Sequence, residues 1–175
     1  MSEAQQAELV RICDAICRPG AGILAADETP AAMADRFASL GIENTEETRR
    51  SYRELLFTVS SERLQPISAV ILNKETLDQQ TGSGQPLLDL VTKAGIVPGV
   101  TVDLGWVPLA SSPLEVFTQG LDGLDGRCAE YKRRGCQFAK WRMVVNIGPG
   151  LPSMTGVEEG ARAMAVYATV CQRNG

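Results

Sequence analysis

The chain contains no histidine among its 175 residues. This absence excludes the Ser–His–Asp triad, the Cys–His pair and the HExxH zinc site. Any catalysis must therefore use lysine, arginine, carboxylate, tyrosine or thiol groups. The five cysteines are odd in number and form no CxxC pair. This usage favours reduced thiols and therefore a cytoplasmic protein.

Long hydrophobic runs and a strong net charge are also missing. No segment approaches the roughly 18 apolar residues that a membrane span needs, and the polar N-terminus does not resemble a signal peptide. The 17 basic and 21 acidic residues give a net charge of −4, which argues against nucleic acid as the main partner. Because 44% of the residues are hydrophobic, we expect a soluble globular protein that binds neither membrane nor nucleic acid.

The sequence does contain apolar runs that alternate with helical segments. Four runs typical of buried strands begin near residues 22, 67, 96 and 138, and no G-x-G-x-x-G motif follows the first. Continuous apolar runs separated by helices predict a parallel sheet covered by helices. Each strand–helix unit takes about 39 residues, so eight units of a closed barrel would need roughly 310 residues. The chain therefore supplies about four of the eight units. We expect helices over residues 3–17, 30–40, 44–57, 86–93, 124–134 and 153–173.

Polar or charged residues stand where each predicted strand ends. In parallel barrels the active site is built at the carboxyl ends of the strands. The sequence therefore predicts a polar site at one rim. Its members are Asp27, Asn73, Lys74, Asp103, Lys140 and Arg142.

The fourth run shows which side chains face this site. Because side chains alternate along a strand, Lys140 and Arg142 share a face with Phe138, whereas Trp141 and Met143 face the covering helices. Two interpretations stay open. The cations either form an anion-binding site with a lysine able to attack a carbonyl, or Lys140 forms a buried ion pair with Asp27 or Asp103 that only stabilises the core.

Several longer motifs resemble those of one known family. They are GAGILAADE at residues 20–28, LGIENTEETRR at 40–50, TQGLDGL at 118–124 and FAKWR at 138–142. In this order they are similar to the class I fructose-bisphosphate aldolases, over about residues 8–175. The resemblance implies an α/β fold of the (β/α)8 TIM barrel family. Residues 1–175 would then form the N-terminal half of that domain, with an N-terminal helix and about the first four units.

The resemblance also implies an activity. The family cleaves fructose 1,6-bisphosphate reversibly to dihydroxyacetone phosphate and glyceraldehyde 3-phosphate, in glycolysis and gluconeogenesis. The chemistry uses a lysine imine as electron sink and requires neither a metal ion nor another cofactor. The implied partners are a sugar phosphate and further copies of the chain, as a homo-oligomer that is tetrameric in the full-length form.

Roles for individual residues follow from the resemblance alone. Asp27 would steer proton transfers, and Lys140 would stabilise charge during the imine-forming steps. Arg142 would help to position the sugar phosphate, and Arg36 and Arg49 would lie near a phosphate. The remaining implied substrate-binding positions are Thr29, Asp103 and Lys74.

The sequence departs from the family pattern at the predicted rim. Thr101 and Leu104 stand where the family usually has lysines, and Lys74 stands where it has histidine. Lys74 could supply the positive charge that is lost where Thr101 replaces the lysine of the family. Pro30 and the two alanines after it replace a polar run, which puts the phosphate contacts there in doubt.

The largest departure concerns the electrophile. The resemblance places the glutamate acid/base on a fifth strand and the imine lysine on a sixth, both after Gly175. We therefore expect a truncated chain that is inactive by itself. Two alternatives remain, namely an imine formed at Lys140 or Lys74, and a non-catalytic half-barrel used for binding or assembly.

Overall fold

The computed structural model describes residues 2–175, which divide into two compact units. The sheet unit comprises Val10–Thr101 and Cys136–Phe138. The hairpin unit comprises residues 2–9, Val102–Gly135 and Ala139–Gly175. No helix within residues 2–175 is long and apolar enough to cross a membrane.

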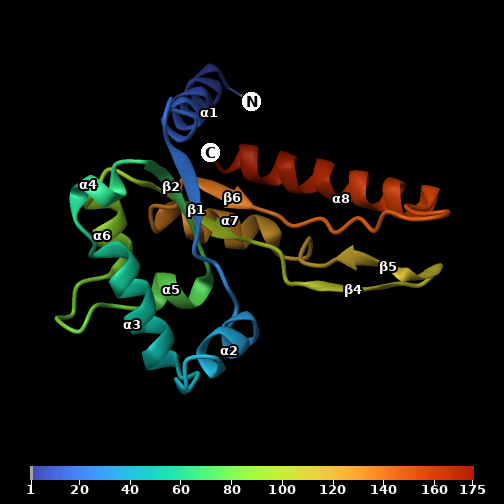
Figure 1. Ribbon diagram of the computed structural model, residues 1–175. Helices are drawn as coiled ribbons and strands as arrows, with labels where there is room; N and C mark the ends of the chain where they lie inside the picture. The colour runs from blue at the N-terminus through green and yellow to red at the C-terminus, as the bar shows by residue number, and fades with distance from the viewer. Residues whose placement is uncertain (1) are drawn as a thin grey trace. The chain divides into compact units, whose positions relative to one another are not determined.

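The sheet unit is built on parallel strands, as the apolar runs predict (Figure 1). The sheet has the order β1-β2-β3-β6, and β6 begins in this unit at Phe138. Ala25 of β1 pairs with Ile71 of β2, which pairs in turn with Gly99 of β3. The strands are β1 (Gly22–Ala25), β2 (Ile67–Leu72), β3 (Val97–Thr101) and β6 (Phe138–Lys140).

One hydrophobic cluster of the sheet unit lies between helix α1 (Glu3–Ile16) and the strands. Ile12 of α1 is buried with Ala69 of β2 and Val97 of β3, and Phe138 packs against them. The Phe138 ring occupies the space in which a Cβ on Gly99 would stand. Only glycine therefore fits at position 99 beside this ring.

Side-chain caps explain where the helices of this unit begin. The Thr29 hydroxyl accepts a hydrogen bond from Ala32 N at 3.2 Å, and Pro30 takes the first helical position. Thr45 and Thr48 form a reciprocal capping box. The predicted helices are confirmed, and α4 and α5 are short additions. The bounds are α2 (Pro30–Ala38), α3 (Glu46–Phe57), α4 (Ser61–Leu64), α5 (Lys74–Asp78) and α6 (Leu87–Lys93).

Strand β1 is less buried than its sequence predicts. The side chain of Ile23 is 50% exposed, and within the strand only Leu24 is even partly buried. β1 stands at the end of the strand order and has one neighbour, β2. An apolar run therefore identifies the strand correctly but does not establish that both of its faces are covered.

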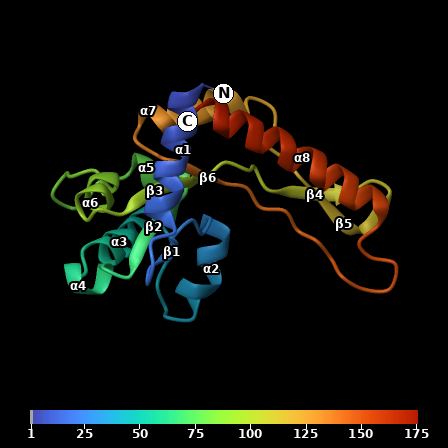
Figure 2. The same cartoon turned by 90° about the horizontal axis from the view of Figure 1, so that it is seen from above.

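The hairpin unit contains an antiparallel pair that the sequence does not reveal. Strands β4 (Trp106–Leu109) and β5 (Ser112–Thr118) pair in a segment that lies outside the predicted strands and helices. Pro108 weakens the strand pattern, but a two-stranded ribbon tolerates proline because each strand has a free edge. Helix α7 (Leu124–Arg133) follows, and α8 (Met154–Arg173) runs alongside the hairpin (Figure 2).

The predicted helix-facing side of the fourth run is confirmed, although the length of the run is not. β6 ends at Lys140, whereas the apolar run continues to Val145. The Trp141 ring stacks on Tyr167 of α8, with the ring centroids 5.4 Å apart. Met143 lies against Gly160 of the same helix. Trp141 and Met143 thus face a helix, as side-chain alternation requires.

Candidate functional site

Asp27 of the sheet unit lies two residues past β1 and is half-buried. Thr101, the last residue of β3, donates a hydrogen bond from Oγ1 to Asp27 Oδ2 at 2.5 Å. Ala25 and Gly99 lie level with each other in the register of the sheet, and Asp27 and Thr101 each follow two residues later. Because side chains alternate along a strand, Asp27 and Thr101 lie on the same face. The polar residues predicted at the strand ends are therefore in direct contact where Asp27 follows β1 and Thr101 ends β3.

Asn73 connects the end of β2 to the backbone that follows Asp27. Its Nδ2 donates to the carbonyl of Glu28 at 2.9 Å, and its Oδ1 accepts from Thr76 N at 2.8 Å and so caps α5. The backbone beyond Asp27 is thus held by a side chain of the neighbouring strand. Lys74 is the first residue of α5 and is exposed.

Glu28 forms the centre of a cluster of charges that includes a fully buried arginine. Arg53 is 2% exposed, and its Nη2 lies 2.9 Å from Glu28 Oε2. Arg36 donates from Nη1 to Glu28 Oε1 and to the Tyr52 hydroxyl, at 2.8 and 2.9 Å. Burial lowers the pKa of Arg53, and the Glu28 carboxylate opposes this shift. Arg36 therefore has a carboxylate partner at the position where the resemblance implies a phosphate.

Sequence reasoning missed Arg53. The signal was present, because Arg53 stands four residues before Phe57 and therefore shares the buried face of α3. The Arg53 nitrogens Nε and Nη1 make no hydrogen bond with residues 2–175.

Arg49 makes a two-pronged ion pair in the sheet unit. Its Nε and Nη2 donate to Glu75 Oε1 and Oε2 at 2.8 and 2.7 Å, and its Nη1 donates to Asn44 Oδ1 at 2.9 Å. The hydrogen bonds to Glu75 raise the pKa of Arg49. All three guanidinium nitrogens have protein partners, so the phosphate role of Arg49 stays a prediction.

Asp103 and Arg142 come together in the hairpin unit. Asp103 is 9% exposed, and its carboxylate accepts from Gly105 N at 3.1 Å and from Arg142 N at 3.3 Å. Arg142 Nη2 lies 3.6 Å from Asp103 Oδ1, and its guanidinium stands 4.2 Å from the centroid of the Trp106 ring. The ion pair weighed for Asp103 had Lys140 as its partner, and the pairing of Asp103 with Arg142 was not predicted from the sequence.

Lys140 is also part of the hairpin unit. Its backbone carbonyl accepts from Val102 N at 3.0 Å, which holds the end of β6 beside the residue that follows β3. The side chain is half-buried. Lys140 and Asp103 are thus anchored in one unit, and Asp27 in the other.

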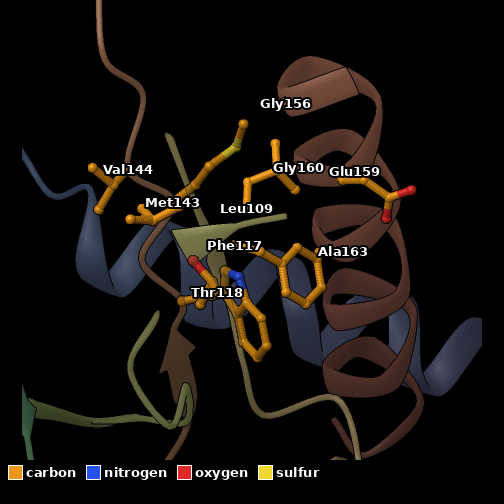
Figure 3. Close-up of a pocket in the computed structure, with 11 residues that line it drawn as sticks. Leu109, Phe117, Thr118, Met143, Val144, Gly156, Glu159, Gly160 and Ala163 are labelled. Atoms are coloured by element: carbon orange, nitrogen blue, oxygen red, sulfur yellow. The ribbon is translucent and has the colours of Figure 1, made fainter. Parts of the chain in front are cut away.

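A pocket opens between the hairpin and α8 (Figure 3). Most of the residues that line it are apolar, and Met143 points across it toward Gly160 (Figure 3). Glu159 is the one ionisable residue in the lining. A pocket with a carboxylate and no cation does not suit a sugar phosphate. The lining residues are Leu109, Val116, Phe117, Thr118, Trp141, Met143, Val144, Gly156, Glu159, Gly160 and Ala163.

Within residues 2–175, no three cysteine or carboxylate side chains gather closely enough to hold a metal ion.

Parallel strands that alternate with helices and end in carboxylates and cations are typical of α/β barrel enzymes. Comparisons with known proteins identify the family within this class. The family model described as "Glycolytic: Fructose-bisphosphate aldolase class-I" matches residues 8–175. The chain belongs to the class I fructose-bisphosphate aldolase family.

Individual relatives agree with this assignment. The fructose-bisphosphate aldolase of Schistosoma mansoni is 50% identical over 175 residues, which cover 100% of this chain and 48% of the relative. Fructose-bisphosphate aldolase 7, cytosolic, from Arabidopsis thaliana is 48% identical over 168 residues, or 96% of this chain and 47% of the relative. The chain thus spans about half the length of the curated relatives it matches.

A solved structure extends the likeness to three dimensions. The fructose-bisphosphate aldolase of Plasmodium falciparum, solved in complex with TRAP and a small-molecule inhibitor, superimposes with a TM-score of 0.94 at 41% identity. The match covers 99% of this chain and 50% of that chain. The expected α/β barrel fold is therefore confirmed. The roles of the individual site residues stay predictions.

Proposed function

We propose that this chain supplies strand-end groups for the reversible aldol cleavage of fructose 1,6-bisphosphate to dihydroxyacetone phosphate and glyceraldehyde 3-phosphate. The observation that carries the proposal is the family match over residues 8–175, together with a half-buried carboxylate at the end of β1. In this proposal residues 1–175 form the N-terminal half of one barrel domain.

The chemistry requires a base where the carbon–carbon bond breaks. Cleavage between C3 and C4 removes the proton of the C4 hydroxyl, and the bond electrons pass to an imine formed with a lysine. Asp27 is the candidate for steering these protons, because a carboxylate held by a hydrogen bond keeps a defined orientation. Lys140 and Arg142 are the candidates for holding substrate hydroxyls and phosphate, since cations bind such groups through charge-assisted hydrogen bonds.

The imine provides the direct test. The resemblance assigns the imine lysine to no position within these 175 residues, so we expect borohydride with substrate to trap no adduct on the chain alone. A chimera that joins this chain to the remaining part of the Schistosoma mansoni relative should form the adduct and cleave fructose 1,6-bisphosphate.

The two measurements separate the competing interpretations. An inactive but folded chimera would overturn the proposed function. An adduct on the 175-residue chain would instead support the alternative imine, and its loss in Lys140→Ala but not in Lys74→Ala would locate it at Lys140.

A second candidate function is a non-catalytic role in binding or assembly. Large apolar side chains favour it, because Ile23 is 50% exposed and Ile147 is 89% exposed. In size-exclusion chromatography we expect the chain to associate. A stable folded monomer would contradict this role.

The substrate class, cellular location and oligomeric state are inferred from the same proposal. We infer a sugar phosphate substrate, a cytoplasmic location and a homo-oligomeric state. The cytoplasmic location is supported by a relative that is described as cytosolic. Fractionation of cells that express the tagged chain tests this location.

A further inference from the structure

We propose that Thr101 is a positioning residue for Asp27, and that its hydroxyl orients the Asp27 carboxylate for proton transfer. This inference rests on the proposed function. It concerns a residue at which this chain departs from the family pattern, so no role for Thr101 comes from the resemblance.

The contact is not one that strand pairing produces by itself. β1 and β3 are both hydrogen-bonded to β2 and not to each other. Neighbouring strands lie about 4.8 Å apart, so the backbones of β1 and β3 are separated by roughly twice that distance. The 2.5 Å contact between Thr101 Oγ1 and Asp27 Oδ2 therefore depends on the two side chains converging on one face of the sheet.

The side chain that follows the middle strand, β2, is engaged in other hydrogen bonds. Continuing the register of the sheet, Asn73, the residue after β2, lies level with Asp27 and Thr101. The Asn73 amide is committed elsewhere, because it donates to Glu28 O and accepts from Thr76. Asn73 therefore holds the backbone after Asp27, and Thr101 holds the Asp27 carboxylate.

Threonine is suited to this task because its side chain is stiff. A β-branched residue has few χ1 rotamers, so its hydroxyl has a defined position. Lysine at the same place would carry its donors on a flexible four-carbon stem. An O–H···O⁻ bond of 2.5–2.7 Å is a strong, charge-assisted one. Such a bond fixes the rotation of the carboxylate, which can still accept hydrogen bonds at its other lone pairs.

Substitutions of Thr101 in the active chimera test the proposal. Thr101→Val keeps the shape and removes the hydroxyl, and Thr101→Ser keeps the hydroxyl. We expect Thr101→Val to lower kcat by about ten- to a hundredfold with KM nearly unchanged, because a hydrogen bond to a charged group is lost from the chemical step. Thr101→Ser should restore kcat to within about threefold of the parent, since the donor is kept.

A matched control separates a lost hydroxyl from a lost contact with Asp27. Thr92 of α6 donates to the Leu88 carbonyl at 2.6 Å on the exposed side of its helix, so Thr92→Val should leave kcat unchanged. If Thr101→Val does not fold, Thr101→Ala takes its place, with circular dichroism as the check of folding.

Each outcome decides between the two proposals. An inactive parent chimera overturns the proposed function and this inference with it. An active chimera in which Thr101→Val cleaves at the parental rate overturns only the role of Thr101. Equal losses in the valine and serine variants also overturn it, because a variant that keeps the hydroxyl would then be no more active than one that lacks it.

Discussion

Asp27 and Asp103 both stand two residues past the end of a parallel strand, yet their surroundings differ. Asp103 is 9% exposed and accepts from two backbone N–H groups, and an arginine stands beside it. Asp27 is half-buried and accepts from the hydroxyl of Thr101. The first arrangement uses the carboxylate to join segments of the chain. The second places a half-buried carboxylate against the hydroxyl of a threonine at the end of another strand.

The difference shows that a charged residue at a strand end does not by itself indicate chemistry. Asp103 ties the turn before β4 to the backbone at Arg142. A buried carboxylate that accepts from two backbone N–H groups holds together the segments that carry them. We therefore expect the loss of Asp27 to impair catalysis and the loss of Asp103 to impair stability.

The largest effect should come from Asp27→Asn in the active chimera. A positioned general acid/base contributes roughly 10²–10⁴-fold to the rate, so kcat should fall by about that factor while the fold is retained. The measurement is steady-state cleavage of fructose 1,6-bisphosphate. Asp89→Asn, on the exposed first turn of α6, is the control and should be neutral. A kcat above a tenth of the parental value would remove Asp27 from the chemistry.

Asp103→Asn should chiefly change stability. The variant keeps one acceptor oxygen but loses the charge, and a hydrogen bond to a charged group contributes about 2 kcal/mol. We expect the free energy of unfolding of the 175-residue chain to fall by about that amount in urea. An unchanged unfolding midpoint would show that the contacts of Asp103 with Arg142 do not contribute to stability.

Arg49→Lys distinguishes a structural arginine from a phosphate ligand. Lysine cannot make the two-pronged contact with Glu75, so we expect a loss of about 1 kcal/mol in unfolding free energy. The KM of the chimera for fructose 1,6-bisphosphate should not change. A severalfold rise in KM at unaltered stability would instead support the phosphate role that the resemblance implies.

The smallest effect concerns Glu115, a buried carboxylate that accepts hydrogen bonds at the start of α8. Hydrogen bonds from the hydroxyl and the backbone N–H of Ser153, at the start of α8, lower its pKa. A lowered folded-state pKa stabilises the protein above the unfolded-state value of about 4.3 and ceases to do so as the pH falls through the folded-state value. The stability difference between the parent and Glu115→Gln should thus shrink on acidification below that range. Urea unfolding at several pH values measures it, and a difference independent of pH would contradict the assignment.

Much of the fold could be predicted because local rules decide it. Thr29, Thr45 and Ser153 cap helices in the way their side chains favour. Alternation along β6 assigned Trp141 to the helical side correctly. The β4–β5 hairpin was missed because Pro108 looks like a loop signal, although the free edge of a short ribbon accepts it.

The candidate site was predictable only in part, because its contacts join residues far apart in sequence. Periodicity identified Asp27 and Asp103 as strand-end residues, but it did not distinguish their partners. Thr101 was noticed as a departure, yet its bond to Asp27 spans 74 positions and depends on the register of three strands. Arg53 was missed since an arginine in a helix is usually exposed.

The contact between Gly99 and the Phe138 ring constrains how this sequence can change over evolutionary time. Because a Cβ at position 99 would overlap the ring, any side chain there is a deleterious step while phenylalanine remains at 138. A smaller residue at 138 would have to come first and would leave a void until position 99 filled it. Positions 99 and 138 are therefore epistatic, and the order of substitutions between them is set by sterics.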